Sequence, residues 1–138
     1  MPLKSVGSFQ RRIYEILIED EKLQHEMIGI YLSVQQDAKH PFILLNLLKL
    51  DDFSKYDKFT YEIEFEICLF GKDKNQEKLL YIADHIVHLM QPSIPAISDY
   101  HIISMKFYKA EWVRGQDIAT TKIITKYKAL IMGDKIYA

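Results

Sequence analysis

The segment from Tyr61 to Phe70 alternates apolar and polar side chains residue by residue. Because successive side chains of a β-strand point to opposite faces, this period of two predicts a strand with one buried and one polar face. Such a strand requires partner strands and a layer that covers its apolar face. The expected buried face carries Tyr61, Ile63, Phe65, Ile67 and Leu69, and the opposite face carries Glu62, Glu64, Glu66 and Cys68.

Two stretches place apolar residues at the spacing of an α-helix. The first runs from Ser8, the expected N-cap, to about Asp20. The second follows a possible capping box of Asp73 and Gln76 and continues to about Met90, where prolines at 92 and 95 end it. The apolar stripes are Phe9, Ile13, Ile16, Leu17 and Leu23 in the first helix, and Leu79, Ile82, Ala83, Ile86 and Leu89 in the second.

Four further stretches indicate strands, over residues 30–34, 42–48, 102–113 and 120–132. Turns are expected at 37–41 and 114–117, and a polar loop at 51–60. This order predicts an α+β fold: a mostly antiparallel sheet of four to five strands with two main helices packed on one face. A chain of 138 residues suits a single domain, 1–138, and we expect residues 1–7 and 133–138 to be flexible.

Lysines share one face of the last predicted strand, as glutamates do on the central strand. If the two strands are antiparallel neighbours with Glu64 opposite Lys126, Glu62 falls opposite Lys128. Exposed pairs of this kind contribute only about 0.2–1 kcal/mol each, so they influence register more than stability. Alternatively, Glu62, Glu64 and Glu66 line an outer surface or the wall of an oligomer, and the sequence leaves these possibilities open.

The charge balance limits the classes of partner. Eighteen basic and nineteen acidic residues give a formal net charge of −1, and only three of the basic residues are arginines. This disfavours general nucleic-acid binding, which relies on a basic surface. No apolar run approaches the roughly 20 residues that span a bilayer, and residues 1–12 lack a signal-peptide core. The single cysteine, Cys68, cannot form an internal disulfide, which fits a reducing cytoplasm. Together with the lack of a membrane-spanning run, this leads us to expect a soluble protein made in the cytoplasm, without membrane contact.

The chain carries no sequence signature of catalysis. It contains no nucleophile elbow, glycine-rich phosphate loop, H-E-x-x-H or C-x-x-C motif. A metal site built from His85, His88 and His101 is conceivable, but a position near a helix end explains the first two. Cys68 alternates with glutamates whose charges disfavour a thiolate, and a solvated strand face explains those glutamates. We therefore expect no catalytic, cofactor-binding or metal-binding residues and no enzymatic activity.

Aromatic residues in the polar loop are more informative. Phe53, Tyr56 and Phe59 lie among aspartates and lysines, outside any amphipathic element. Aromatic side chains presented on a polar loop are typical of a partner contact. An equally favoured interpretation is that the three rings fold back over the sheet and cover the core. Trp112 near the last hairpin has the same two interpretations, with core packing favoured.

The whole pattern, over about residues 8–132, matches one known family in the order of its elements and in several residue groups. These are Phe9-Gln10, Ile13 to Leu17, Asp20 and Leu23, then Ile30-Tyr31, His40-Pro41-Phe42, the strand from Tyr61 to Phe70, Ile82 to Ile86, Pro92 and Pro95, and the closing hairpin. The chain resembles the tail-completion proteins of long-tailed bacteriophages and gene-transfer particles, also called tail terminators or tail-to-head joining proteins.

The resemblance implies a structural role in the virion, at the tail or neck, for a protein made in the bacterial host cytoplasm. Such proteins form a homohexameric ring that caps the tail tube, ends its polymerisation and docks to the head-completion or connector protein. DNA passes through the ring without specific binding. On this hypothesis Glu62, Glu64 and Glu66 face the lumen, and Phe53, Tyr56 or Phe59 contacts a neighbouring subunit or the tail tube protein.

Two other classes of function remain open at this stage. A small α+β ligand-binding or regulatory module acting as a dimer has the same element content, because a fold does not determine a function. It requires a pocket with a few convergent polar groups. A metal-dependent hydrolase that uses His85, His88 and His101 is the third alternative.

Overall fold

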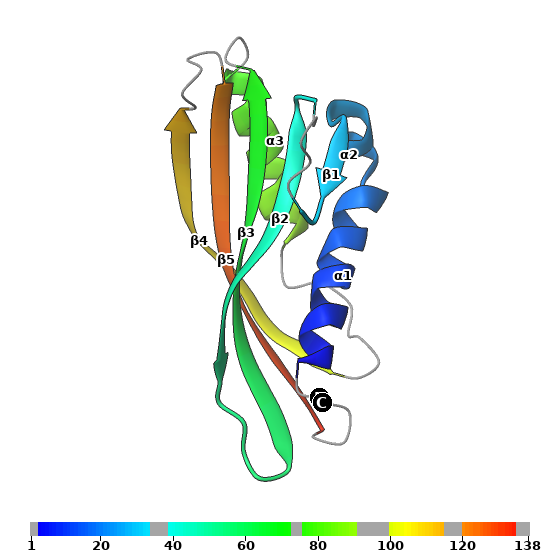
Figure 1. Cartoon of the computed structure of the whole chain (residues 1–138), viewed down its shortest axis with the longest axis vertical. Helices are drawn as coiled ribbons and strands as arrows, with labels where there is room; N and C mark the ends of the chain where they lie inside the picture. The colour runs from blue at the N-terminus through cyan, green and yellow to red at the C-terminus, as the bar shows by residue number, and fades with distance from the viewer. Residues whose placement is uncertain (1–2, 34–38, 73–75, 91–99, 115–119, 135–138) are drawn as a thin grey trace.

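The sheet of this protein has two different faces, and its helices cover one of them (Figure 1). The computed structural model describes residues 3–33, 39–72, 76–90, 100–114 and 120–134. In chain order the elements are α1 (Lys4–Glu19), α2 (Glu21–Glu26), β1 (Gly29–Tyr31), β2 (Phe42–Asp52), β3 (Lys58–Lys72), α3 (Gln76–Leu89), β4 (His101–Arg114) and β5 (Thr120–Asp134). The sheet order is β1-β2-β3-β5-β4, and every pairing is antiparallel except the parallel pair β1–β2. The α+β fold expected from the sequence is therefore confirmed.

The core lies between the helices and the alternating face of β3. Phe65, at the middle of β3, is 0% exposed and packs edge-on against Phe9 of α1, with ring centroids 5.5 Å apart. On the neighbouring strand, Tyr127 stacks on Phe65 at 5.0 Å. The Tyr127 hydroxyl donates to Thr125, whose hydroxyl donates to the carbonyl of Ile67, so both buried polar groups are satisfied. Burial also raises the pKa of Tyr127.

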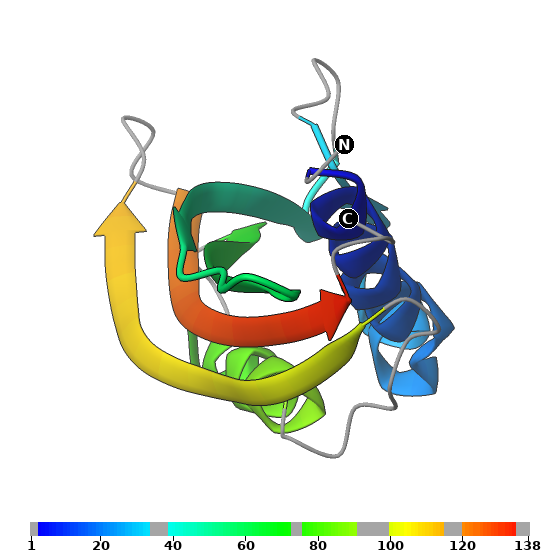
Figure 2. The ribbon, with the colours of Figure 1, turned by 90° about the horizontal axis from the view of Figure 1, so that it is seen from below.

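The strands are long and bend along their length, so the sheet curls strongly (Figure 2). β-Bulges interrupt the ladders between Leu47 and Lys49 of β2, and at two places in β4. A bulge adds one residue to one strand and increases the local twist. In β4 the bulged positions are Ile103 and Tyr108, and the side chains of both are substantially exposed.

Near the N-terminus, the structure corrects the expected helix boundaries. Ser8 is not the N-cap, because α1 already begins at Lys4, after Leu3. The chain breaks its helix at Asp20, whose side chain accepts a hydrogen bond from the backbone of Leu23 and caps the separate helix α2. Leu23 therefore belongs to α2, and not to the first helix.

From β2 onward, several strands extend further than the sequence predicts. The predicted loop at 51–60 shrinks to residues 53–57, since β2 continues to Asp52 and β3 begins at Lys58. β5 continues to Asp134, which pairs with Lys58, into the segment expected to be flexible. The expected features at 34–38, the capping residue Asp73, the helix-ending Pro92 and Pro95, and the turn residues 115–117 lie outside the described residues.

Replacing Phe65 with Ala should cost about 3–5 kcal/mol of unfolding free energy, because it leaves a cavity where three elements meet. The measurement is urea denaturation followed by circular dichroism. Leu80→Ala, at an exposed position of α3, is the control and should change stability by less than about 0.5 kcal/mol. Equal losses in the two variants would contradict this account of the core.

Candidate functional site

The face of the sheet that the helices leave open carries a cross-strand ladder of charges. Glu64 of β3 lies between Lys49 of β2 and Lys128 of β5, and Glu66 lies opposite Lys126. β3 and β5 are thus antiparallel neighbours, as considered from the sequence. The register differs by two residues from the pairing of Glu64 with Lys126, and it places Glu62 opposite Leu130 instead of Lys128. The glutamates and lysines share a face in either register.

The ladder continues onto β4 at the edge of the sheet. Lys109 and Lys126 both approach Glu111, with N···O distances of 2.9 and 3.8 Å. The hydrogen bond from Lys109 lowers the pKa of Glu111. Tyr108 donates a hydrogen bond to Glu64, and the ammonium of Lys128 lies 5.0 Å from the centre of the Tyr108 ring. Acids and bases are therefore interspersed, and each exposed contact contributes little to stability.

One end of this open face is apolar. Phe42 stacks on Phe70 with centroids 4.5 Å apart, and the ammonium of Lys122 lies 5.3 Å from the Phe70 ring centre. Beside them, Leu44, Cys68 and Ile124 form a small second cluster of buried side chains. Burial is the main cause that raises the pKa of the Cys68 thiol to about 12, and the Glu66 carboxylate adds to it. This environment keeps the thiol protonated and does not suit a nucleophile.

The β2–β3 turn, residues 53–57 with the flanking Asp52 and Lys58, projects beyond the end of α1 (Figure 1); we call it the hairpin tip. Phe53 is 57% and Tyr56 98% exposed. Phe59, in contrast, is 1% exposed and packs against Tyr61 in the core, so the monomer buries one of the three aromatic residues expected at an interface. Phe59 thus packs in the core, as the lid interpretation expects, whereas Phe53 and Tyr56 face solvent and their contact with a partner stays a prediction.

Backbone and side-chain hydrogen bonds hold the hairpin tip. The amide of Phe53 donates to the carbonyl of Thr60, and the amide of Lys55 donates to the carbonyl of Lys58. Ser54 adds two bonds, since its amide donates to Asp52 and its hydroxyl accepts from the amide of Thr60. The exposed aromatic rings are therefore mounted on an ordered turn.

Strand β4 forms one edge of the sheet and carries further exposed apolar side chains. Trp112 is 59% exposed, so the core position favoured by the sequence is wrong. The exposed apolar side chains of β4 are Ile103, Phe107, Tyr108, Trp112 and Val113. An edge strand offers unpaired backbone groups, and β4 combines them with bulges and lysines that discourage uncontrolled pairing.

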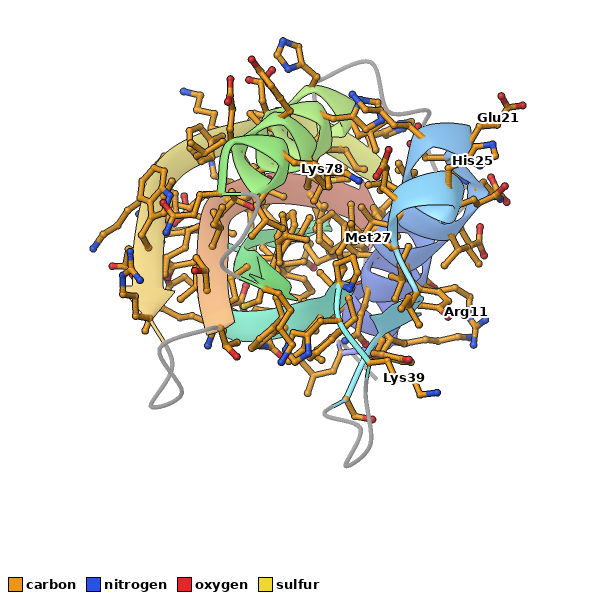
Figure 3. The ribbon with its side chains drawn as sticks, turned by 90° about the horizontal axis from the view of Figure 1, so that it is seen from above. Arg11, Glu21, His25, Met27, Lys39 and Lys78 are labelled. Carbon is orange, nitrogen blue, oxygen red and sulfur yellow. The ribbon has the colours of Figure 1, made fainter. Side chains whose placement is uncertain are left out.

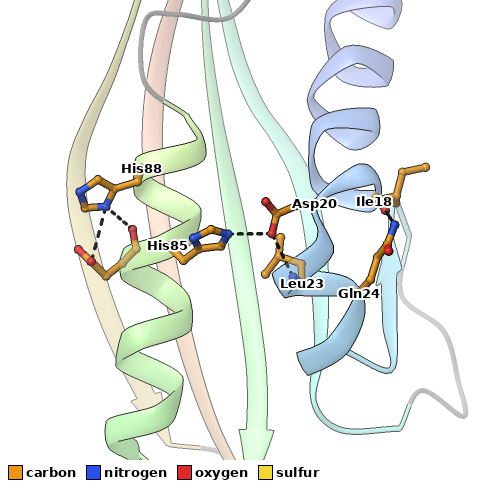
Figure 4. A network of polar contacts seen from close by, with 7 residues as sticks. Ile18, Asp20, Leu23, Gln24, His85 and His88 are labelled. Carbon is orange, nitrogen blue, oxygen red and sulfur yellow. Dashed lines mark hydrogen bonds and ion pairs between the residues drawn. The ribbon is translucent and has the colours of Figure 1, made fainter.

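The histidines of the proposed metal site have other contacts (Figure 4). His85 Nε2 lies 2.7 Å from Asp20 Oδ2 and so ties α3 to the cap of α2, while His88 Nδ1 lies 2.8 Å from the carbonyl oxygen of Asp84. His101 is exposed at the start of β4. Within the described segments, no three His, Cys, Asp or Glu side chains are grouped to hold a metal, and no helix is long and apolar enough to cross a membrane.

A surface groove between α1 and β1 is a feature that the sequence analysis missed. It has a volume of about 410 Å³. Gly7, Gln10, Arg11 and Tyr14 line it from α1, and Ile30 and Tyr31 of β1, with Leu32 just after the strand, line it from the other side. The helical spacing of the first four residues is visible in the sequence, but nothing there shows which strand lies opposite them.

Comparison with known proteins finds a shared fold with a solved structure but no match in sequence to a family or to a curated protein. The structure is similar to a chain in the solved virion of a native gene transfer agent (GTA) particle, with a TM-score of 0.82. The match covers 93% of this chain and 97% of that chain at 16% sequence identity. An identity this low shows the common fold and does not transfer residue roles.

Thiol reactivity tests the assigned environment of Cys68. At mildly alkaline pH, alkylation of the folded protein should be slower by roughly three orders of magnitude than that of an ordinary thiol, because only the thiolate reacts. Mass spectrometry follows the modification, and denaturant should restore the ordinary rate. Lys55→Cys, which adds a thiol at the exposed hairpin tip, is the control and should react at once. Fast modification of Cys68 in the folded wild-type protein would contradict the assignment.

Proposed function

We propose that this protein is a tail terminator: a structural virion protein, without enzymatic activity, that caps the tail tube as a ring and joins tail to head. The observation that carries the proposal is the fold shared with a chain of a gene transfer agent virion over 93% of this chain. The resemblance in the order of elements and in residue groups supports the same role. Its partners would be further copies of itself, most simply as a hexamer, the tail tube protein and the head-completion or connector protein.

The surfaces of the monomer fit a protein that works by assembly. Its exposed apolar side chains include two aromatic rings at the hairpin tip and others on separate elements, among them α3 and the edge strand β4. Different patches that meet head to tail generate a closed ring when the rotation between copies is right. Within the described residues the open sheet face bears charges of both signs and no grouped metal ligands.

We place the open sheet face, with Glu62, Glu64 and Glu66, toward the lumen of the ring. A lumen through which DNA moves must not hold the phosphate backbone tightly. Lysines occupy the neighbouring strands of this face, and the glutamates of β3 lie between them. The glutamates then have a functional role beyond register, because they offset a basic surface that would otherwise retain DNA.

Oligomeric state is the first test of the proposal. Native mass spectrometry over a concentration series should show a closed hexamer, either alone or with added tail tube protein, and electron microscopy should show the ring at tube ends. Tubes that keep growing in the presence of the protein would contradict the capping role. A stable dimer that retains a small molecule would instead favour the regulatory module, for which the groove between α1 and β1 offers a site lined by both polar and apolar side chains.

Neutralising the open face should increase DNA binding. The double variant Glu64→Gln and Glu66→Gln removes two negative charges from beside Lys126 and Lys128. Its affinity for double-stranded DNA at low salt should rise at least several-fold over wild type and fall steeply with added salt. Fluorescence anisotropy measures the binding.

The control is Glu19→Gln with Glu21→Gln, which changes the net charge equally at exposed positions near the α1–α2 junction. It should leave DNA binding near the wild-type level. The same gain in both double variants would mean that net charge alone matters, and the assignment of this face to the lumen would then fail.

A further inference from the structure

We infer that the groove between α1 and β1 receives the hairpin tip of the next copy of this chain. The inference rests on the proposed ring and adds the contact that would close it. The tip is a projecting, ordered element of the chain (Figure 1) and carries two exposed aromatic rings. The groove lies between other elements of the same molecule, α1 and β1. A projecting patch and a receiving patch that differ make a head-to-tail contact, the type that builds rings.

One position of the α1 wall of the groove is a glycine, Gly7, which has no side chain. Gly7 lies inside the helix, where glycine is destabilising relative to alanine. A Cβ added to Gly7 would meet no atom within 4 Å beyond its chain neighbours and the backbone of its own helix, so packing against the other described elements does not require glycine there. Gln10, Arg11 and Tyr14 continue the same stripe along α1. A partner that packs closely against this stripe explains why a residue without a side chain stands at Gly7.

The β1 wall has a matching local arrangement. A Cβ at Gly29 would lie 2.1 Å from the hydroxyl oxygen of Tyr31, so glycine allows the Tyr31 ring to lie along the strand. Tyr31 also packs against Phe42, with ring centroids 5.9 Å apart. This wall is therefore fixed by packing within the monomer and does not depend on the occupant.

The dimensions of the groove suit the aromatic residues of the tip. An engineered apolar cavity of about 150 Å³ accommodates one benzene molecule. The groove, at about 410 Å³, has room for the two rings of Phe53 and Tyr56. Tyrosine and phenylalanine are effective interface anchors, because they bury a large area with few rotatable bonds.

Charge favours the same pairing. Arg11 projects outward from α1, and Lys39 lies on the same side of the molecule near β1 (Figure 3). Neither side chain has an ion-pair partner among the residues that the structure describes. The hairpin tip carries Asp52 and Asp57 beside Lys55 and Lys58, and Lys58 is paired with Asp134. Asp57 is exposed on the tip, and an ion pair between Asp57 and Arg11 of the groove would orient the contact.

Two variants test this contact, one altered at the hairpin tip and the other in the groove, each measured alone and then in a mixture. The tip variant carries Phe53→Ser and Tyr56→Ser, and it keeps Phe59 because that ring is part of the core. The groove variant, Gly7→Phe, fills the hollow without meeting any atom of its own chain at the Cβ position. Each variant alone should be monomeric in native mass spectrometry. An equimolar mixture should give a one-to-one heterodimer and nothing larger, since one intact tip and one intact groove remain.

Matched controls separate this contact from general surface effects. Tyr81→Ser removes a comparably exposed aromatic residue of α3, and Glu19→Phe adds an aromatic residue to α1 outside the groove. Both should assemble as the wild type does. Circular dichroism and thermal unfolding should show that all four variants fold.

A cross-link gives a second readout that does not depend on ring stability. Lys55→Cys on the tip and Gln10→Cys in the groove should join different chains through a disulfide or a short thiol cross-linker, and the double variant should give a ladder of multimers. Cys68 is 0% exposed and contributes no background. The single variants should show no ladder.

The outcomes distinguish this inference from the proposed function. Rings that form equally well from the tip variant and the groove variant, without a tip-to-groove cross-link, overturn the inference and leave the capping role standing. Isolated dimers cross-linked tip to tip also overturn it, since a symmetric contact does not lead to a ring. A wild-type chain that forms the cross-link but never caps a tube overturns the proposed function and leaves the contact itself intact.

Discussion

The fold depends on the alternation of β3, which gives the strand one apolar face and an opposite face that is polar except at Cys68 and Phe70. On the apolar face, Phe65 meets Phe9 and Tyr127, which joins α1 to the two central strands in one contact. β3 pairs with β5 from Lys58 to Lys72 and with β2 from Tyr61 to Phe70, so its face pattern is imposed on both neighbours. Since α1, α2 and α3 contribute to the same core cluster, the other face stays open and must remain polar or find a partner.

The open face and the open edges of the sheet are the surfaces that this fold leaves available for contacts with other molecules. β1 covers only Phe42 to Leu44 of β2, and β4 has no neighbouring strand on its outer side in the described chain. Edges of this kind are hazardous unless bulges, lysines or a designated partner protect them. The described surface offers projecting aromatics, interspersed charges and a groove, features that fit the proposed assembly. We see no comparable arrangement of reactive groups in the same residues, since Cys68 is buried and His85 is occupied by Asp20.

Periodicity predicted the faces of the strands but could not predict the register between them. A slip of one residue would move every apolar side chain of β5 to the wrong face, so the alternation excludes it. A slip of two residues keeps each side chain on its face and still sets lysines opposite glutamates. The sequence therefore gave no reason to prefer Glu64 opposite Lys128 over Glu64 opposite Lys126. Because α3 and β4 separate β3 from β5 in the chain, no local turn sets this register, and it is a tertiary feature.

Phe59 and Asp20 were predictable in principle, whereas the groove was not. Phe59 continues the period of two that begins at Tyr61, so the alternation already assigned it to the buried face. Asp20 is followed by Glu21 and precedes Leu23 by three residues, the pattern of an N-cap at the start of a new helix. The groove requires Gly7 and Tyr31 to be brought together from separate elements. Only the folded chain makes that juxtaposition visible, and a chain that shares this fold at 16% identity need not share the groove.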